Sequence, residues 1–84
     1  MSNSRYPAAD GHPRIVIDPT VMYGKPCING TRIPVDILLD QLSLGETVDE
    51  IISGYPRLTR DDIAAALSYA ADALRPTRLP DAAE

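Results

Sequence analysis

The chain has 84 residues, of which 44% are hydrophobic and 24% are charged, so its length and composition fit one globular domain. Eight Lys and Arg residues against twelve Asp and Glu residues give a net charge of −4. The chain as a whole therefore repels a phosphate backbone, and any contact with nucleic acid needs a local basic patch.

Cysteine and histidine each occur once, which excludes an internal disulfide and a zinc site made of these residues. No apolar run has the length of a signal sequence or a membrane span. We therefore expect a cytoplasmic protein with no bound metal, no cofactor and no membrane contact.

Polar, Pro-containing segments stand at both ends of the chain. Residues 1–13 predict a disordered N-terminal arm, and residues 76–84 predict a flexible C-terminal tail. Residues 14–75 between them are expected to form one domain of α+β class. We predict a short N-terminal β-hairpin packed on a three-helix bundle of helix-turn-helix type, mostly α.

The Asn29-Gly30 pair lies between short apolar runs, which is the strongest local signal for a β-hairpin because both residues tolerate positive φ. The pattern predicts that Cys27 and Ile28 pair with residues 31–33. The run "RIVI" at residues 14–17 is a possible third strand.

From Val35 the apolar residues recur with the spacing of one helical face. Pro34 is expected in the first turn of this helix, and Gly45 supplies its left-handed stop. A second, short helix is predicted to start at a capping box of Thr47 and Glu50 and to stop at Gly54.

The third predicted helix begins after Thr59 as N-cap, has Asp61 and Asp62 in its first turn, and ends before Pro76. Its length is about 15 residues by the same spacing rule. Its expected buried face is formed by Ile63, Ala66, Leu67, Ala70 and Leu74.

Three stretches, "IDP", "YGKPCINGTRIPV" and "GETVDEIISGYPRLTRDDIAAALSYAADAL", resemble the domain-of-unknown-function 433 family, whose members are small bacterial and archaeal proteins regarded as antitoxin-like. The resemblance runs from Ile15 to about Leu74. It implies a β-element fused to a helix-turn-helix fold, encoded beside a PIN-like nuclease, as in a VapBC-type pair. Such antitoxins generally form dimers, bind their own promoter and block the toxin.

Four residues are candidates for contact with operator DNA. Arg60 and Ser68 lie on the outward face of the third helix, which would be the recognition helix. Lys25 and Arg57 lie in turns where a basic cluster could meet phosphate. Structural alternatives stay open. The acids beside Arg60, Asp61 and Asp62, would only stabilise the helix start. Lys25 would be a solvated turn residue, and Arg57 would pair with a helix acid.

Three arginines are candidates for contact with a protein partner, since an inhibitor of a nuclease with a carboxylate cluster gains from a planar, bidentate cation. These are Arg32, Arg75 and Arg78. Strand alternation would turn Arg32 away from the core. Arg75 is equally explained as a cation that complements the C-terminal end of the third helix.

No nucleophile–base pair, phosphate-cradling loop or metal-ligand spacing is present in the sequence, which predicts a protein that is not an enzyme and takes no small-molecule substrate. The function expected is that of a homodimeric antitoxin that neutralises a PIN-like ribonuclease toxin by direct binding and represses its own operon. The alternatives are a stand-alone helix-turn-helix regulator and a dimeric protein-binding adaptor without DNA binding.

Overall fold

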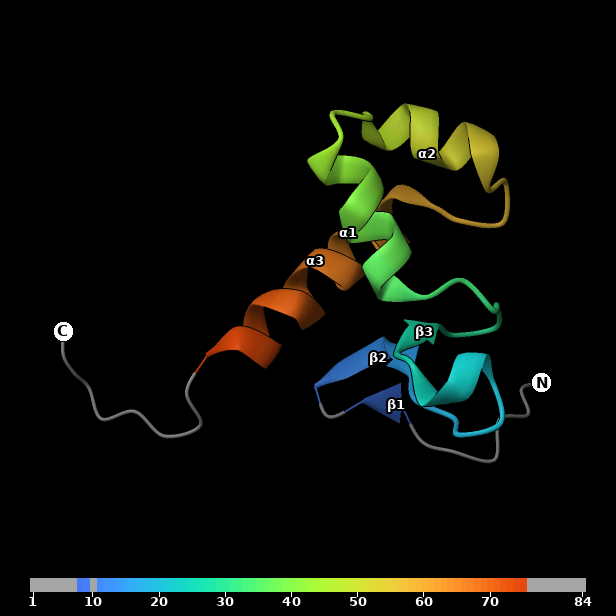
Figure 1. Ribbon diagram of the computed structural model, residues 1–84, viewed down its shortest axis with the longest axis vertical. Coiled ribbons are helices and arrows are strands. Elements are labelled where there is room, and N and C mark those ends of the chain that lie inside the picture. Colours follow the sequence, from blue (N-terminus) through green and yellow to red (C-terminus); the bar gives the residue numbers. More distant parts are fainter. Residues whose placement is uncertain (1–7, 10, 76–84) are drawn as a thin grey trace, which may run out of the picture.

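The computed structural model describes residues 8, 9 and 11–75, and it confirms the predicted α+β fold (Figure 1). A small sheet lies on one side of three helices. In chain order the elements are β1 (Ala8–Ala9), β2 (His12–Val16), the 3₁₀ turn η1 (Met22–Gly24), β3 (Cys27–Ile28), α1 (Val35–Ser43), α2 (Val48–Gly54) and α3 (Arg60–Leu74).

The sheet is antiparallel, with strand order β1-β2-β3, and its register places Ile15 opposite Ile28. The predicted pairing of Cys27 and Ile28 with residues 31–33 is present only in part. The Ile28 amide donates to the Ile33 carbonyl at 3.0 Å, the Thr31 amide donates to the Ile28 carbonyl at 3.0 Å, and an isolated antiparallel bridge joins Cys27 to Pro34. Residues 31–33 form no strand, and the strand that pairs with β3 is β2. The Thr31 hydroxyl also holds the turn, since it donates to the Ile28 carbonyl at 2.8 Å and accepts from the Ile33 amide at 3.0 Å.

The prediction of a disordered arm over residues 1–13 is corrected where the structure describes that segment. Ala8–Ala9 form β1, and β2 begins at His12. His12 is buried: its Nε2 lies 2.7 Å from an Asp72 carboxylate oxygen, and its ring meets Tyr69 edge-on at 5.4 Å. The rest of the predicted arm, and the predicted tail over residues 76–84, lie outside the described residues.

The helix starts follow the local sequence signals. In α2, Thr47 and Glu50 form the predicted capping box, with bonds of 2.8 and 3.1 Å between backbone and side chains. Gly45, with φ +94°, supplies the predicted left-handed stop after α1. Pro34 differs from the prediction, since it is the N-cap of α1 with an extended backbone rather than a first-turn residue.

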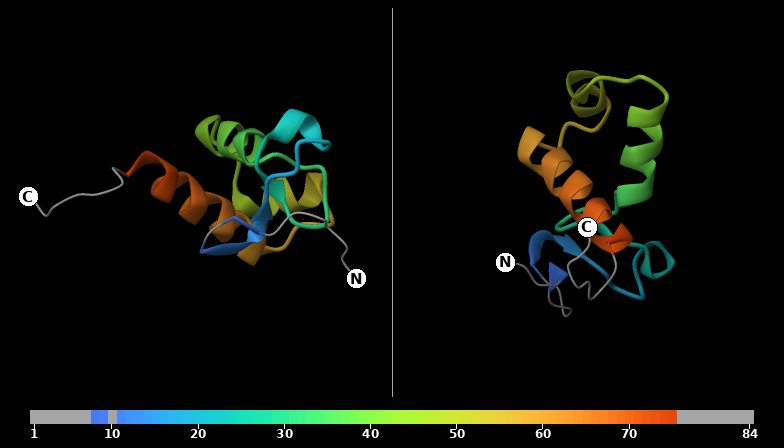
Figure 2. Two further views of the ribbon diagram at one scale, coloured as in Figure 1. Left: turned by 90° about the horizontal axis from the view of Figure 1, so that it is seen from below. Right: turned by 90° about the vertical axis from the view of Figure 1, so that its left-hand side faces the viewer.

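One core joins the sheet to all three helices (Figures 1 and 2). The side chains that are less than 5% exposed and pack together are Ile15, Ile28, Val35, Leu38, Ile51, Leu58, Ile63 and Ala66. The expected buried face of α3 is thus confirmed only over its first half, because Leu67 is 46% and Leu74 86% exposed. No helix within the described part of the chain is both long and apolar enough to cross a membrane.

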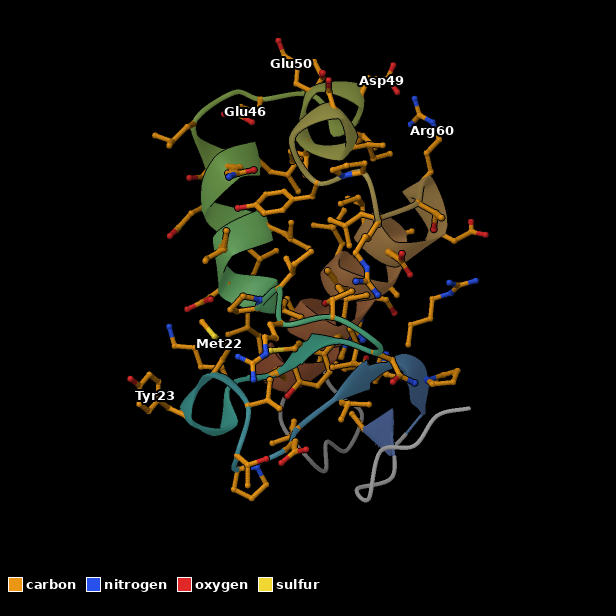
Figure 3. All side chains as sticks on the ribbon, turned by 90° about the vertical axis from the view of Figure 1, so that its right-hand side faces the viewer. Met22, Tyr23, Glu46, Asp49, Glu50 and Arg60 are labelled. Carbon is orange, nitrogen blue, oxygen red and sulfur yellow. The ribbon has the colours of Figure 1, made fainter. Side chains whose placement is uncertain are left out.

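The loop between β2 and β3 holds two residues in the left-handed region that L-residues rarely adopt. Met22 has φ +48° and Tyr23 φ +60°. Backbone bonds of 2.9–3.1 Å, from Val21 to Asp18, from Gly24 to Val21 and from Lys25 to Met22, keep this conformation. Tyr23 is 93% exposed and points away from the domain (Figure 3). The loop therefore stores strain without burying the aromatic ring.

We expect Tyr23→Gly to raise the free energy of unfolding by about 0.5–1 kcal/mol, because glycine adopts positive φ without the Cβ clash. Urea denaturation followed by circular dichroism measures the change. Tyr23→Ala is the matched control: it removes the same exposed ring, keeps Cβ, and is expected to give no gain. Equal stabilisation by both variants would contradict backbone strain as the cause.

Candidate functional site

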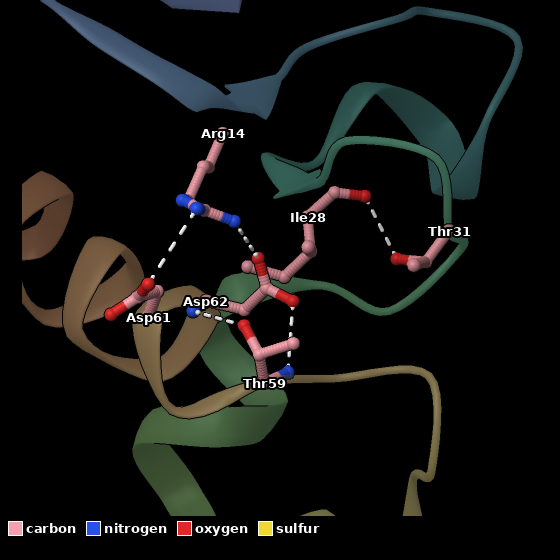
Figure 4. Close-up of polar contacts among 6 residues, drawn as sticks. All are labelled: Arg14, Ile28, Thr31, Thr59, Asp61 and Asp62. Carbon is pink, nitrogen blue, oxygen red and sulfur yellow. Dashed lines mark hydrogen bonds and ion pairs between the residues drawn. The ribbon is translucent and has the colours of Figure 1, made fainter.

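The N-terminal end of α3, the expected DNA-reading end, is occupied by an internal contact with the sheet (Figure 4). Asp62 is buried and closes a capping box with Thr59, its Oδ2 accepting from the Thr59 amide at 3.0 Å. Its Oδ1 accepts from Arg14 Nη1 at 3.0 Å, and a second Arg14 nitrogen lies 3.8 Å from Asp61. The two acids therefore hold the helix start and β2 together.

Arg60 and Ser68 both lie exposed on α3, as the DNA-binding prediction requires. The Arg60 guanidinium, however, donates to Asp49 in the first turn of α2 at 2.8 Å. Glu46 and Glu50 stand at the same end of the molecule (Figure 3), which gives this end an acidic surface around a single arginine. Such a surface disfavours close approach of a phosphate backbone.

Lys25 lies apart from this end. Its Nζ is 3.1 Å from an Asp36 carboxylate oxygen in the first turn of α1. Lys25 lines a groove beside Tyr69 and Ala70 of α3, whereas Arg57 lines a different cavity, so these two DNA-binding candidates lie on separate surfaces.

Arg32 and Arg57 are brought together on the wall of an open cavity of about 630 Å³, here called the Arg32 cavity. Arg57 Nη2 donates to the Gly30 carbonyl at 3.1 Å, which fixes its guanidinium beside the turn. The cavity lies over β3 and the turn after it. Its lining is Val16, Asp18, Val21, Cys27, Ile28, Asn29, Gly30, Thr31, Arg32, Ile33 and Arg57.

Arg32 is exposed and, among the lysines and arginines of the described chain, it alone has neither a hydrogen bond nor an ion pair. Arg75 is bound to Asp72, the carboxylate that also holds His12. Arg78 lies outside the described residues. Of the three partner-binding candidates, Arg32 is therefore the described cation whose donors remain available.

Cys27 is one of the lining residues of the Arg32 cavity, and its thiol donates to the Lys25 carbonyl oxygen at 3.3 Å. Burial raises the pKa of the Cys27 thiol, and the negative charge of Asp36 adds to this effect while Lys25 opposes it. The thiol is thus protonated at neutral pH and a poor nucleophile. Within the described residues, no group of three or more His, Cys, Asp or Glu side chains could hold a metal ion.

Comparison with known proteins shows which family the chain belongs to. The family model described as "Protein of unknown function (DUF433)" matches residues 15–70. The chain belongs to the DUF433 family. None of the curated proteins compared with it matches.

A solved DUF433 structure resembles this chain. It is the crystal structure of a DUF433 member protein from Anabaena variabilis ATCC 29413 at 2.00 Å, with 37% sequence identity and a TM-score of 0.68. The match covers 70% of this chain and 58% of that one, so the chain spans little more than half the length of the related protein.

The segment matched by the DUF433 model contains the Arg32 cavity but not Arg14 or His12. Sequence reasoning missed both residues. Their partners, Asp62 and Asp72, lie 48 and 60 positions away, so no local pattern could have paired them. The roles of the seven predicted site residues in DNA or partner binding stay predictions.

Asp62→Ala is expected to lower the free energy of unfolding by about 2 kcal/mol, because it opens the capping box of α3 and releases Arg14. Chemical denaturation measures this change. The neighbouring Asp61→Ala, which removes an exposed charge and no cap, should cost less than about 0.5 kcal/mol. Equal losses of unfolding free energy in the two variants would show that the bonds of Asp62 to Thr59 and Arg14 contribute no more than an exposed charge does.

The Cys27 thiol is expected to react with iodoacetamide at least about tenfold more slowly in the native protein than in urea at the same pH, because both burial and the raised pKa reduce reaction. Mass spectrometry follows the modification.

The raised pKa of Cys27 also means that the folded state holds the thiol proton more tightly than the unfolded state does. The stability of wild type relative to Cys27→Ala should therefore be constant below the ordinary pKa of 9.0 and decline as pH rises above it. A pH-independent difference would contradict this sign.

Proposed function

We propose that this DUF433 protein is the antitoxin of a type II toxin–antitoxin pair, which neutralises a PIN-like ribonuclease by direct binding and represses its own operon. The observation that supports it is Arg32, an exposed arginine with unused donors on the wall of a cavity that also holds Arg57. An arginine fork binds a carboxylate bidentately, and a nuclease of this type carries a carboxylate cluster.

The shape of the Arg32 cavity favours a protein partner over a nucleic acid. Val16, Val21 and Ile33 give it apolar walls, while the two arginines supply its cations. A protruding acidic segment of a protein could place apolar contacts on the walls and a carboxylate at Arg32. A duplex would gain little from a concave, largely apolar surface.

The protein-binding adaptor without DNA binding is the second candidate, and the α3 start supports it. Asp61 and Asp62 occupy the first turn, and Arg60 is engaged by Asp49. If the operon is autoregulated through DNA contact, the free protein should therefore bind weakly and the toxin complex more tightly. A gel-shift titration with and without toxin separates an antitoxin repressor from both alternatives, since a stand-alone regulator would bind tightly and with strong salt dependence by itself.

Arg32→Glu is expected to weaken the complex with the nuclease encoded beside this protein at least about tenfold, because it places a like charge against the partner's acids. Co-expression, co-purification and calorimetry provide the measurement, with inhibition of ribonuclease activity as a second readout. Arg60→Glu is the matched control, with the same charge change at an exposed arginine outside the cavity.

The control should bind as tightly as the wild type. If no complex co-purifies and the neighbouring protein is harmless by itself, the antitoxin proposal fails. If a complex forms but Arg32→Glu and Arg60→Glu weaken it alike, the Arg32 cavity is not the docking site.

A further inference from the structure

The Arg32 cavity combines a positively charged lining with apolar walls in one concave space. Its volume of about 630 Å³ lies within the range of roughly 300–1,000 Å³ that small-molecule sites occupy. Arg32 and Arg57 bring two guanidinium groups to the lining, and Asp18 brings one carboxylate. The lining therefore has an excess of one positive charge, on a chain whose net charge is −4. Such a site attracts small anions that the rest of the chain repels.

The three charged residues of the lining differ in how the fold holds them. Arg57 Nη2 donates at 3.1 Å to the carbonyl of Gly30, a turn residue with φ +85°. One Asp18 carboxylate oxygen accepts from the Thr20 amide at 2.8 Å and from the Thr20 hydroxyl at 2.7 Å. Arg32 is exposed and makes no hydrogen bond or ion pair within the described chain. The donors of Arg32 are thus available to a ligand.

The apolar walls add a second requirement for that ligand. Val16, Val21 and Ile33 line the cavity, and each of them is only partly buried. A ligand with an apolar body would cover the part of these side chains that remains in contact with water, and removal of apolar surface from water favours binding. The cavity therefore suits a molecule that has an apolar body and one anionic group.

We propose that the Arg32 cavity is a binding site for a small amphipathic monocarboxylate, whose carboxylate accepts from the Arg32 guanidinium while its apolar body contacts the walls. A carboxylate matches the planar fork of an arginine, and its single charge balances the excess positive charge of the lining. A phosphate monoester carries about −1.5 to −2 charges at pH 7 and would be repelled more strongly by Asp18. A neutral molecule of the same shape would leave the donors of Arg32 unpaired.

The regulatory consequence of this site rests on the proposed function. A carboxylate of the toxin and a small acid would use the same donors of Arg32, so the two would exclude each other. The concentration of the acid would then set the fraction of the antitoxin that is free to bind the nuclease. Binding of the acid itself needs no toxin.

The test is a titration of the isotope-labelled protein with hexanoate at constant ionic strength, followed by nuclear magnetic resonance. We expect saturable shifts in the signals of residues 28–33 and of the Arg32 and Arg57 side chains, with a dissociation constant on the order of 1 mM for a ligand of this size. Acetate keeps the charge and lacks the alkyl chain, whereas hexanamide keeps the chain and lacks the charge. Each of them should bind at least about fivefold more weakly than hexanoate, and so should hexyl phosphate.

Arg32→Gln removes the guanidinium at an exposed position, so it should leave the fold intact and weaken hexanoate binding at least about fivefold. Arg60→Gln is the matched control, because it makes the same change at an exposed arginine outside the cavity and should bind hexanoate as the wild type does. The proposal is overturned by the absence of saturable binding, by hexanamide or hexyl phosphate binding as tightly as hexanoate, or by equal effects of the two variants. Shifts centred on the exposed leucines of α3, Leu67 and Leu74, would overturn it as well.

The complex with the neighbouring nuclease gives a separate readout. Hexanoate at about ten times its dissociation constant should raise the apparent dissociation constant of the toxin about tenfold. A complex that is insensitive to saturating hexanoate would contradict the mutual exclusion. If no complex forms while hexanoate still binds in an Arg32-dependent manner, the proposed function fails and the ligand site stands.

Discussion

The arrangement of the molecule depends on the buried carboxylate of Asp62, because this one side chain joins two segments that are distant in the chain, the start of α3 and β2. It closes the N-terminal cap of α3 through Thr59 and accepts a bond from Arg14 in β2. Strand alternation then turns the next residue, Ile15, inward, where it is 0% exposed. The helix start, the sheet and the centre of the core are therefore positioned by the same contact.

This use of charge also bears on function. Asp61 and Asp62 contact Arg14 of the sheet, and Arg60 contacts Asp49 of α2. A helix-turn-helix protein would place this end of α3 in the major groove. Here the charged side chains of that end make contacts within the domain. Arg32 is the contrasting case. It is held by no acid of the described chain and stands on a cavity wall. This distribution of paired and unpaired cations is the reason for proposing recognition through the turn after β3 rather than through α3.

Features set by neighbours in the sequence could be predicted, and features set by distant contacts could not. The helices follow from spacing and caps: Thr47 with Glu50 and Thr59 with Asp62 act within one turn. The hairpin prediction was right only in part: the turn closes through backbone bonds between Ile28, Thr31 and Ile33, but the strand that pairs with β3 is β2, which the turn signal does not reveal. The ordering of His12 by Asp72 links residues 60 positions apart. Of the candidate site, the exposure of Arg32 was predictable, whereas the placement of Arg57 beside it, through a bond to the Gly30 carbonyl, was not.

The proposed docking at the Arg32 cavity would have to draw most of its affinity from the apolar walls, because one exposed ion pair contributes little by itself. Val16, Val21 and Ile33 supply such walls beside Arg32 and Arg57. The arginine would then fix the orientation of a partner's carboxylate, while burial of apolar surface would supply the binding free energy. Such a division of roles follows from the structure of the cavity, in which Arg57 is held by the Gly30 carbonyl and Arg32 has no partner among the described residues.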